Sequence, residues 1–360
     1  MASLFGKSWK RRELLSRGDI AQFAGIERAV LDDGPARGLR VATLRTGSGL
    51  EAQVLIDRCL DIGLATFNGA ALALRSFTGD THPAYYNPAG MEWLRTFGAG
   101  LLTTCGLSNV GAPSRDNNEE YGLHGRISNT PASNVAVNAQ WRGNEYHFSV
   151  SGVMREGHLF GPKLVLHRVI SSKLGANFIE IRDTITNEDF IDAPLLLLYH
   201  FNIGFPIVTD GSRLLCRAKT TTPRDAEAEK GLATCKQFEA PQVGYKEQVF
   251  YHDLTAAADG KVSVAIVTPA CNQALLLEYP KKALPYFVQW KMMRQGSYVV
   301  GLEPANCHVG GRAAEREAGT MEILKPGAEK SVTLRISVLH TARDIEKIVT
   351  VHHEGTKTQR

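Results

Sequence analysis

The sequence lacks several features that mark particular classes of protein. No segment reaches the roughly 20 continuous apolar residues of a membrane-spanning helix, and the first residues, MASLFGKSWKRR, contain no apolar run of a signal peptide. The six cysteines stand at positions 59, 105, 216, 235, 271 and 307, and no two are spaced as a CxxC pair. Neither a zinc finger nor a disulfide scaffold is indicated, so we expect reduced thiols in a cytoplasmic protein.

A strong excess of one charge is also missing. The 41 basic and 37 acidic residues leave a net charge of +4 at pH 7, and the one basic run, Lys7 to Arg12, is short. Proteins that bind nucleic acid or anionic membranes cluster their positive charge, so we expect neither partner. The chain has 43% apolar residues and therefore lacks the low hydrophobicity of disorder.

Short apolar or alternating runs recur along the whole chain between Gly, Pro, Asn and Asp residues. They lie at 39–44, 52–56, 62–67, 70–77, 134–141, 146–154, 163–170, 178–186, 195–202, 214–220, 248–254, 262–268, 274–279, 286–292, 299–303, 321–324 and 331–339. Such spacing predicts an all-β sandwich or barrel.

Helical periodicity and linkers are scarce. A short N-terminal helical segment is expected at about 8–17, a second at about 90–97, and a frayed polar tail at about 353–360. The polar stretch 219–239 is predicted to be a long loop, which in a compact domain often carries function. Because no linker or composition shift divides the chain, we predict a single β-sandwich domain over residues 1–360.

The stretch 193–206, APLLLLYHFNIGFP, has the pattern of a strand buried on both sides. Side chains alternate along a strand, so His200 and Asn202 share one face with Leu196 and Leu198, while Tyr199 lies on the other. An unpaired buried polar group costs about 1–3 kcal/mol. His200 and Asn202 are therefore expected to pair with protein groups or with a ligand.

Two further segments place a side chain that can transfer protons near glycine: His124 in YGLHGRISN at 121–129, and Glu303 in GLEPAN at 301–306. Each has a structural explanation on its own: His124 as a loop residue, His200 as a hydrogen-bonded core histidine, Glu303 as half of an ion pair. Perturbed titratable groups mark sites only statistically. Three such segments in one chain favour a common site.

These segments resemble a known family. GLHG around His124, YHFN around His200 and LE ending at Glu303 are similar, in order, to the signature segments of the aldose 1-epimerases and galactose mutarotase-like proteins. LLTTCGL, GLHGRISN and GLEPAN are similar to a branch of mostly undefined function. The resemblance extends from about residue 57 to 303 and implies a large galactose mutarotase-like β-supersandwich with few short helices.

The resemblance also implies roles. His200 would be the general acid toward the sugar ring oxygen, Glu303 the base that takes the anomeric proton, and His124 a ligand-orienting residue. Ring opening of a hemiacetal needs one such acceptor and one such donor, and reclosure inverts the anomeric centre. No metal or redox cofactor is required, so we expect none.

The chain departs from the family pattern at several positions. Where active relatives usually have Asn before the first histidine and Gly-Gly after it, this chain has Glu119 to Gly122 before and Arg126 shortly after, so Arg126 is expected to reach the pocket and favour an acidic or unusual sugar. A glutamine after the glutamate is replaced by Pro304-Ala305-Asn306. The expected substrate-binding residues are His124, Arg58, Arg126, Asn202, Asp253 and Asn306.

Several alternatives stay open. Arg58 is equally compatible with a structural pair to Asp57, and Trp290 with a stacking platform or plain core. A metal-dependent sugar isomerase using His124, His200 and His252 lacks close ligand spacing. A non-catalytic carbohydrate-binding or regulatory module is the third function. We expect a small-molecule sugar partner, and the sequence leaves the sugar and a homo-oligomer undecided.

Overall fold

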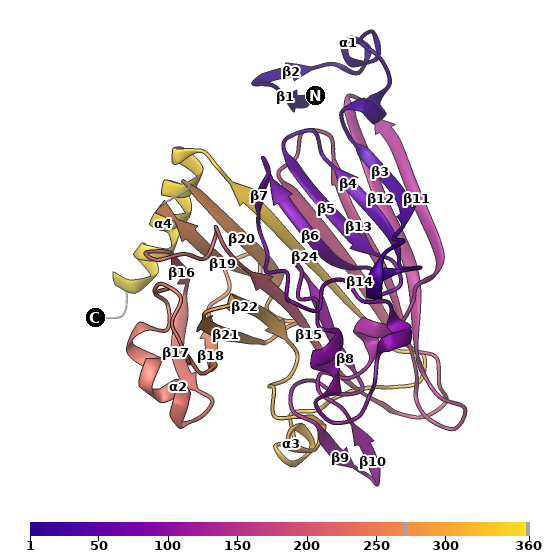
Figure 1. Ribbon diagram of the computed structural model, residues 1–360, viewed down its shortest axis with the longest axis vertical. Coiled ribbons are helices and arrows are strands. Elements are labelled where there is room, and N and C mark those ends of the chain that lie inside the picture. The colour runs from indigo at the N-terminus through magenta and orange to yellow at the C-terminus, as the bar shows by residue number, and fades with distance from the viewer. Residues whose placement is uncertain (270–271, 358–360) are drawn as a thin grey trace.

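The computed structural model describes residues 1–269 and 272–357, about half of them in strands of antiparallel β-sheets (Figure 1). The largest sheet has eight strands in the spatial order β11, β12, β13, β14, β24, β20, β19 and β16. Their bounds are β11 (Ser133–Arg142), β12 (Glu145–Gly157), β13 (Lys163–Lys173), β14 (Phe178–Asn187), β24 (Glu329–Leu339), β20 (Gln273–Pro280), β19 (Lys261–Thr268) and β16 (Arg213–Cys216).

A second sheet carries two of the three segments singled out above, those of His200 and Glu303. Its order is β17 (Ala218–Pro223), β18 (Gln248–Leu254), β21 (Tyr286–Arg294), β22 (Ser297–Ala305), β15 (Ala193–Ile203) and β23 (Glu322–Leu324), and β8 (Thr103–Leu107) also pairs with β15. Strand β15 therefore pairs with β22, β23 and β8.

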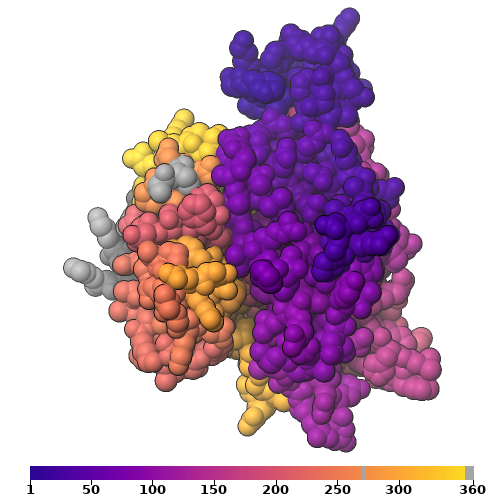
Figure 2. Space-filling model, in the orientation of Figure 1, coloured from indigo at the N-terminus to yellow at the C-terminus, as the bar shows by residue number. Residues whose placement is uncertain are grey.

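The remaining strands form a five-stranded sheet and two hairpins. The sheet consists of β3 (Gly25–Val30), β4 (Arg40–Arg45), β5 (Leu50–Leu55), β6 (Asp61–Phe67) and β7 (Ala70–Ala71). The hairpins are β1 (Ala2–Leu4) with β2 (Lys7–Trp9), and β9 (Ser114–Asp116) with β10 (Glu119–Tyr121). The N-terminal hairpin and the helix after it lie at one end of the molecule (Figure 2, top, indigo).

Helices are few and short apart from the last one. They are α1 (Arg11–Leu15), α2 (Ala226–Gly231), α3 (Arg312–Glu317) and α4 (Ala342–Lys357). Single 3-10 turns lie at η1 (Ile20–Gln22), η2 (Gly34–Ala36), η3 (Pro83–Tyr85), η4 (Glu92–Thr96), η5 (Ile127–Asn129) and η6 (Leu232–Thr234). No described helix has the length and apolar character needed to cross a membrane.

The two faces of β15 belong to different apolar clusters, as the alternation predicts. Leu195, Leu197 and Tyr199 face the main core, which draws residues from all three large sheets. Leu196 and Leu198 face a smaller cluster that includes Trp93, Phe97, Val249 and Val288. The predicted two-sided burial of this strand is confirmed, and the smaller cluster surrounds the candidate site.

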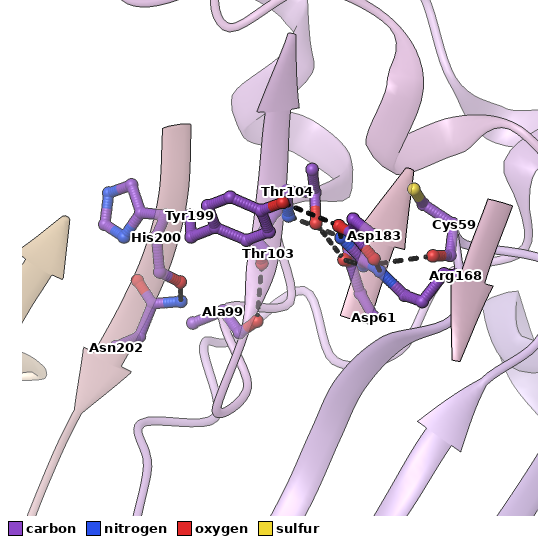
Figure 3. A network of polar contacts seen from close by, with 10 residues as sticks. All are labelled: Cys59, Asp61, Ala99, Thr103, Thr104, Arg168, Asp183, Tyr199, His200 and Asn202. Atoms are coloured by element: carbon purple, nitrogen blue, oxygen red, sulfur yellow. Dashed lines mark hydrogen bonds and ion pairs between the residues drawn. The ribbon is translucent and has the colours of Figure 1, made fainter. Parts of the chain in front are cut away.

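A fully buried polar network holds the core side of β15 in place (Figure 3). The Arg168 guanidinium donates to Asp183 at 2.9 and 2.6 Å and to Asp61 at 2.8 Å. Tyr199 donates its hydroxyl to Asp183 at 2.7 Å, and Asp61 accepts both the backbone N–H and the hydroxyl of Thr104 at 2.9 and 2.6 Å. Strands β6, β8, β13, β14 and β15 are thereby tied together.

Some predicted elements differ from the structure. The run 214–220 is not one strand: it divides into β16 and β17, which belong to different sheets. The run 70–77 is strand only in β7, because the chain then leaves that sheet and Leu74 donates its N–H to the Asn202 carbonyl of β15. Strand β3 escaped the pattern because four of its residues are exposed, which removes the apolar alternation.

The chain ends also differ in detail. The predicted helical segment 8–17 contains α1 but overlaps β2, and the segment 90–97 contains η4. The tail predicted from about 353 begins inside α4, which runs to Lys357, while residues 358–360 and Cys271 lie outside the described residues. The described cysteines, 59, 105, 216, 235 and 307, are free thiols.

Candidate active site

A cavity of about 420 Å³ opens on the side of β15 that faces away from the main core. His124, His200 and Glu303 all line it, although 179 residues separate the first from the last in the sequence. Its size lies within the range of about 300–1,000 Å³ that is usual for small-molecule sites. The structure therefore brings the three motif residues together.

His200 and Glu303 face each other on neighbouring strands. The register pairs Phe201 with Leu302 and Leu198 with Ala305, which sets His200 on β15 opposite Glu303 on β22. His200 Nε2 lies 3.1 Å from Glu303 Oε1, and both side chains are buried. No hydrogen bond joins these two atoms. Among the described residues, Glu303 Oε1 has no hydrogen-bond partner, and neither has the other ring nitrogen of His200, Nδ1.

Gly301 makes room for this pair. A methyl group added at its Cα would overlap Glu303 Oε1 and lie 3.1 Å from His200 Cε1. Any larger side chain would displace one or both groups. The glycine two residues before Glu303 is therefore required for their approach.

His124 reaches the cavity from a strained loop. Its φ of 58° is in the left-handed region, which non-glycine residues rarely adopt, and such strain is often found at functional sites. Its Nδ1 accepts the Gly111 N–H at 3.3 Å, and its backbone carbonyl accepts the Gly106 N–H at 2.9 Å. With Nδ1 accepting, the neutral imidazole carries its proton on Nε2 and can donate it to a ligand.

Burial shifts the protonation of all three groups in the same direction, toward the neutral form. It raises the pKa of Glu303 well above its usual value; Glu247 adds to the rise and Arg224 opposes it. It lowers the pKa of His200 well below its usual value, with a further decrease from His124. Burial also lowers the pKa of His124 to about 4. Burial thus favours a neutral carboxyl group beside neutral imidazoles in the sugar-free site.

The cavity rim contains a charged group that sequence analysis missed. Arg224 donates through Nε to Asp225 at 2.8 Å and through Nη2 to Glu247 at 3.0 Å. Glu247 also accepts the indole N–H of Trp290 at 3.0 Å. The Trp290 ring lies 5.4 Å from the His200 ring, so this group extends from the rim to the His200–Glu303 pair. Arg224 belongs to the polar stretch 219–239. The length of this stretch was the only feature of the sequence that pointed to a functional residue here.

Three predicted ligand contacts bind protein groups instead. Arg58 is buried and donates to the Thr81 carbonyl at 2.8 Å. Asn202 donates to the carbonyls of Gly100 and His200 at 3.1 and 3.0 Å. Asn306 accepts the Leu197 N–H at 2.6 Å and donates to the Leu195 carbonyl at 2.9 Å. Asn306 also donates to the Glu322 carboxylate at 2.8 Å. None of the three lines the cavity, and most of their partners are backbone groups.

Arg126 and Asp253 lie elsewhere. Arg126 lines two neighbouring cavities with Ser108 and Tyr121, on the far side of the His124 loop. Asp253 shares a strand face with Val249, but four residues further along β18, about 13 Å away at the usual rise. There it pairs with Lys281 at 3.0 Å. The argument for an acidic sugar from Arg126 therefore loses its geometric basis.

The three histidines of the metal hypothesis do not converge. His252 is buried outside the cavity, with Nδ1 2.9 Å from the Thr221 hydroxyl and Nε2 2.9 Å from Gln289 Oε1. Over residues 1–269 and 272–357, no group of three His, Cys, Asp or Glu side chains is placed to hold a metal ion.

Known proteins share the family and the fold of this chain. A family model described as a domain of unknown function, DUF4432, matches residues 36–338. The chain belongs to the DUF4432 family. No curated protein matches the chain significantly.

Among solved structures, a "putative aldose 1-epimerase" from Klebsiella pneumoniae superposes on this DUF4432 protein with a TM-score of 0.86 and 25% identity, covering 93% of this chain and 88% of the other. A galactose mutarotase-like protein from Clostridium acetobutylicum gives 0.59 and 13%, covering 89% and 100%. Galactose 1-epimerase from Lactobacillus acidophilus gives 0.57 and 13%, covering 88% and 99%. The fold is galactose mutarotase-like, as predicted.

Proposed function

We propose that this DUF4432 protein interconverts the anomers of a free aldose by acid–base ring opening. The observation that carries the proposal is the buried His200–Glu303 pair, whose facing atoms are 3.1 Å apart in one cavity with His124. Both an acid and a base must reach the same hemiacetal, and this pair is close enough to do so. The fold shared with proteins named as epimerases and mutarotases supports the same reaction class.

The roles follow from the bonds that change. Glu303 accepts the proton of the anomeric hydroxyl while His200 donates a proton to the ring oxygen, and the bond between that oxygen and the anomeric carbon breaks. After the carbonyl group turns, His200 takes the proton back from the new hydroxyl and Glu303 returns its proton to the carbonyl oxygen. His124 donates from Nε2 to a sugar hydroxyl and holds the ring in place.

The pair must carry one proton in total for this cycle. In the empty site burial favours that proton on Glu303, whereas ring opening starts with it on His200. Both arrangements have the same number of protons, so no exchange with solvent is needed to pass between them. Sugar hydroxyls that donate to the Glu303 carboxylate stabilise the working form, and so does the nearby Arg224 charge.

Saturation-transfer NMR of anomeric exchange across a panel of free aldoses tests the proposal. We expect at least one sugar to exchange faster with the protein than without it, and the rate to survive exhaustive chelation. Binding without exchange for every sugar would contradict the proposal and favour a carbohydrate-binding module. Loss of exchange on chelation, restored by one equivalent of a transition metal, would favour a metal-dependent isomerase.

A further inference from the structure

The cavity around the catalytic pair is lined by a few titratable and by many apolar side chains. The titratable side chains that line it are His124, His200, Arg224, Glu247 and Glu303. The apolar side chains lie in or beside η4, in the His124 loop, on β18 and between β22 and α3, namely Met91, Leu94, Phe97, Leu123, Val249 and Val309. A sugar with a hydroxyl on every carbon would bring some of its hydroxyl groups against these side chains, which have no hydrogen-bonding atoms.

The two tryptophans that line the cavity, Trp93 and Trp290, add to its apolar surface. Trp93 donates its indole N–H to the Ser128 hydroxyl at 3.0 Å, and Trp290 donates its own to Glu247 at 3.0 Å. Neither N–H is left for a ligand, because an indole has only this one donor. The two rings therefore offer a bound sugar carbon surface only.

Part of the cavity mouth, away from Arg224 and Glu247, is apolar as well. Met91 is 53% exposed and Leu94 is 47% exposed, although both are large hydrophobic residues that line the cavity. Covering them with an apolar part of a ligand is favourable, and covering them with a hydroxyl group is not.

The position of the apolar part follows from the covalent structure of an aldopyranose. The substituent on C5 is two bonds from the ring oxygen. If His200 donates to that oxygen, this substituent lies beside the His200 ring. The aromatic neighbours of that ring include His124 at 5.9 Å, Phe97 at 5.7 Å and Trp290 at 5.4 Å. His124 already holds a sugar hydroxyl in the proposed function. A methyl group fits Phe97 and Trp290, whereas the hydroxyl of a hydroxymethyl group finds no partner on either.

We propose that the substrate is a 6-deoxyaldose, a sugar that carries a methyl group on C5 where ordinary hexoses carry hydroxymethyl. This inference rests on the proposed function, because the place of the methyl group depends on His200 acting at the ring oxygen. It replaces the acidic sugar that Arg126 had suggested, since Arg126 lies outside the cavity.

Matched sugar pairs that differ only in the C6 hydroxyl test the inference: 6-deoxy-D-galactose against D-galactose, 6-deoxy-D-glucose against D-glucose, and L-rhamnose against L-mannose. Hydrophobic pockets discriminate against one added hydroxyl by about 100-fold at most. We therefore expect kcat/KM for anomeric exchange to be about 10- to 100-fold higher for the deoxy member of the accepted pair. Exchange of the hydroxylated member at an equal or higher kcat/KM would overturn this inference alone. Absence of exchange in every pair would overturn the proposed function and this inference with it.

Two variants locate the discriminating surface. Phe97→Tyr adds a hydroxyl near His200, and Val309→Thr adds one to the apolar lining of the cavity at almost constant volume. Each variant is expected to reduce the preference for the deoxy sugar several-fold. Phe160→Tyr and Val243→Thr make the same changes at positions that are 91% and 85% exposed and line no part of this cavity, and should leave the preference unchanged. An unchanged preference in both cavity variants, shown to be folded by thermal denaturation, would overturn the assignment.

Discussion

Tyr199 and His200 are neighbours on β15, but the polar groups on the two faces of this strand are in opposite states. On the core face, Tyr199, Asp183, Arg168 and Asp61 hydrogen-bond to one another (Figure 3). On the cavity face, His200 Nδ1 and Oε1 of the opposing Glu303 have no hydrogen-bond partner in the part of the chain that the structure describes. Unsatisfied buried groups cost about 1–3 kcal/mol each.

On this single strand, we expect the residues of one face to determine stability and those of the other face to determine activity. The core network uses its charges to fix five strands, so a change there is expected to alter stability. The cavity pair is held by the sheet without using its own reactive atoms, so a change there is expected to alter turnover. The predictions below test that division, beginning with the largest effect.

The largest effect is expected for Glu303→Gln. The amide keeps the shape of the side chain but cannot accept a proton, so exchange of an accepted sugar should fall by about 10²- to 10⁴-fold while the sugar still binds. Stability should not fall, because burial already favours the neutral carboxyl group. Anomeric exchange, calorimetric binding and urea unfolding on one preparation measure these quantities.

Glu329→Gln is the matched control, since Glu329 is exposed on β24 and does not line the cavity. It should leave exchange unchanged. Near-normal exchange in Glu303→Gln would exclude this carboxylate as the base.

Arg168→Met should damage the other face. It leaves Asp61 and Asp183 buried without their cation, and breaking such a pair costs about 3–5 kcal/mol of unfolding free energy. Arg335→Met makes the same change in a 44% exposed arginine that pairs with Glu180, and should cost about 0–1 kcal/mol. Equal losses of unfolding free energy in the two variants, measured by denaturant unfolding, would show that the buried network contributes no more to stability than an exposed ion pair.

A subtler change on the core face is Tyr199→Phe. Removing a hydroxyl that donates to a carboxylate should cost about 1.5–3 kcal/mol of unfolding free energy, with little loss of exchange. Tyr279→Phe is the control, because the buried Tyr279 hydroxyl has no hydrogen-bond partner among the described residues and its removal should cost nothing. A large fall in exchange for Tyr199→Phe without loss of stability would contradict the assignment of the core face to stability alone.

The smallest effect concerns pH. A pair with the ordinary values of 6.5 for histidine and 4.5 for glutamate would carry its single proton only between those limits. Because burial lowers the pKa of His200 and raises that of Glu303, His200 should be mostly neutral at pH 6.5, where an ordinary histidine is half protonated, and Glu303 mostly protonated at pH 4.5. The imidazole NMR shifts of the sugar-free protein, assigned by comparison with His200→Asn, measure the first of these states. A His200 ring that is half protonated at pH 6.5 would contradict the account.

Much of this organisation was predictable from sequence, and the failures have physical causes. The alternation at 193–206 predicted both faces of β15, because a strand has only two. Motif resemblance predicted that His124, His200 and Glu303 converge, which no local pattern could show. Arg126 was misplaced because the loop turns sharply at His124 and Gly125, both with positive φ, and sends residue 126 to another cavity. Arg224 and Glu247 were missed because their partnership depends on the pairing of β17, β18 and β21.

The central claim is that His200 and Glu303 act as one catalytic unit that the fold does not need. Its most direct test is anomeric exchange of an accepted sugar by His200→Asn, Glu303→Gln and the double variant, with unfolding free energies on the same samples. The account predicts that the double variant exchanges about as slowly as the slower single variant and unfolds no more easily than the wild type. Losses of exchange that multiply in the double variant, or that follow a matching fall in stability, would contradict it.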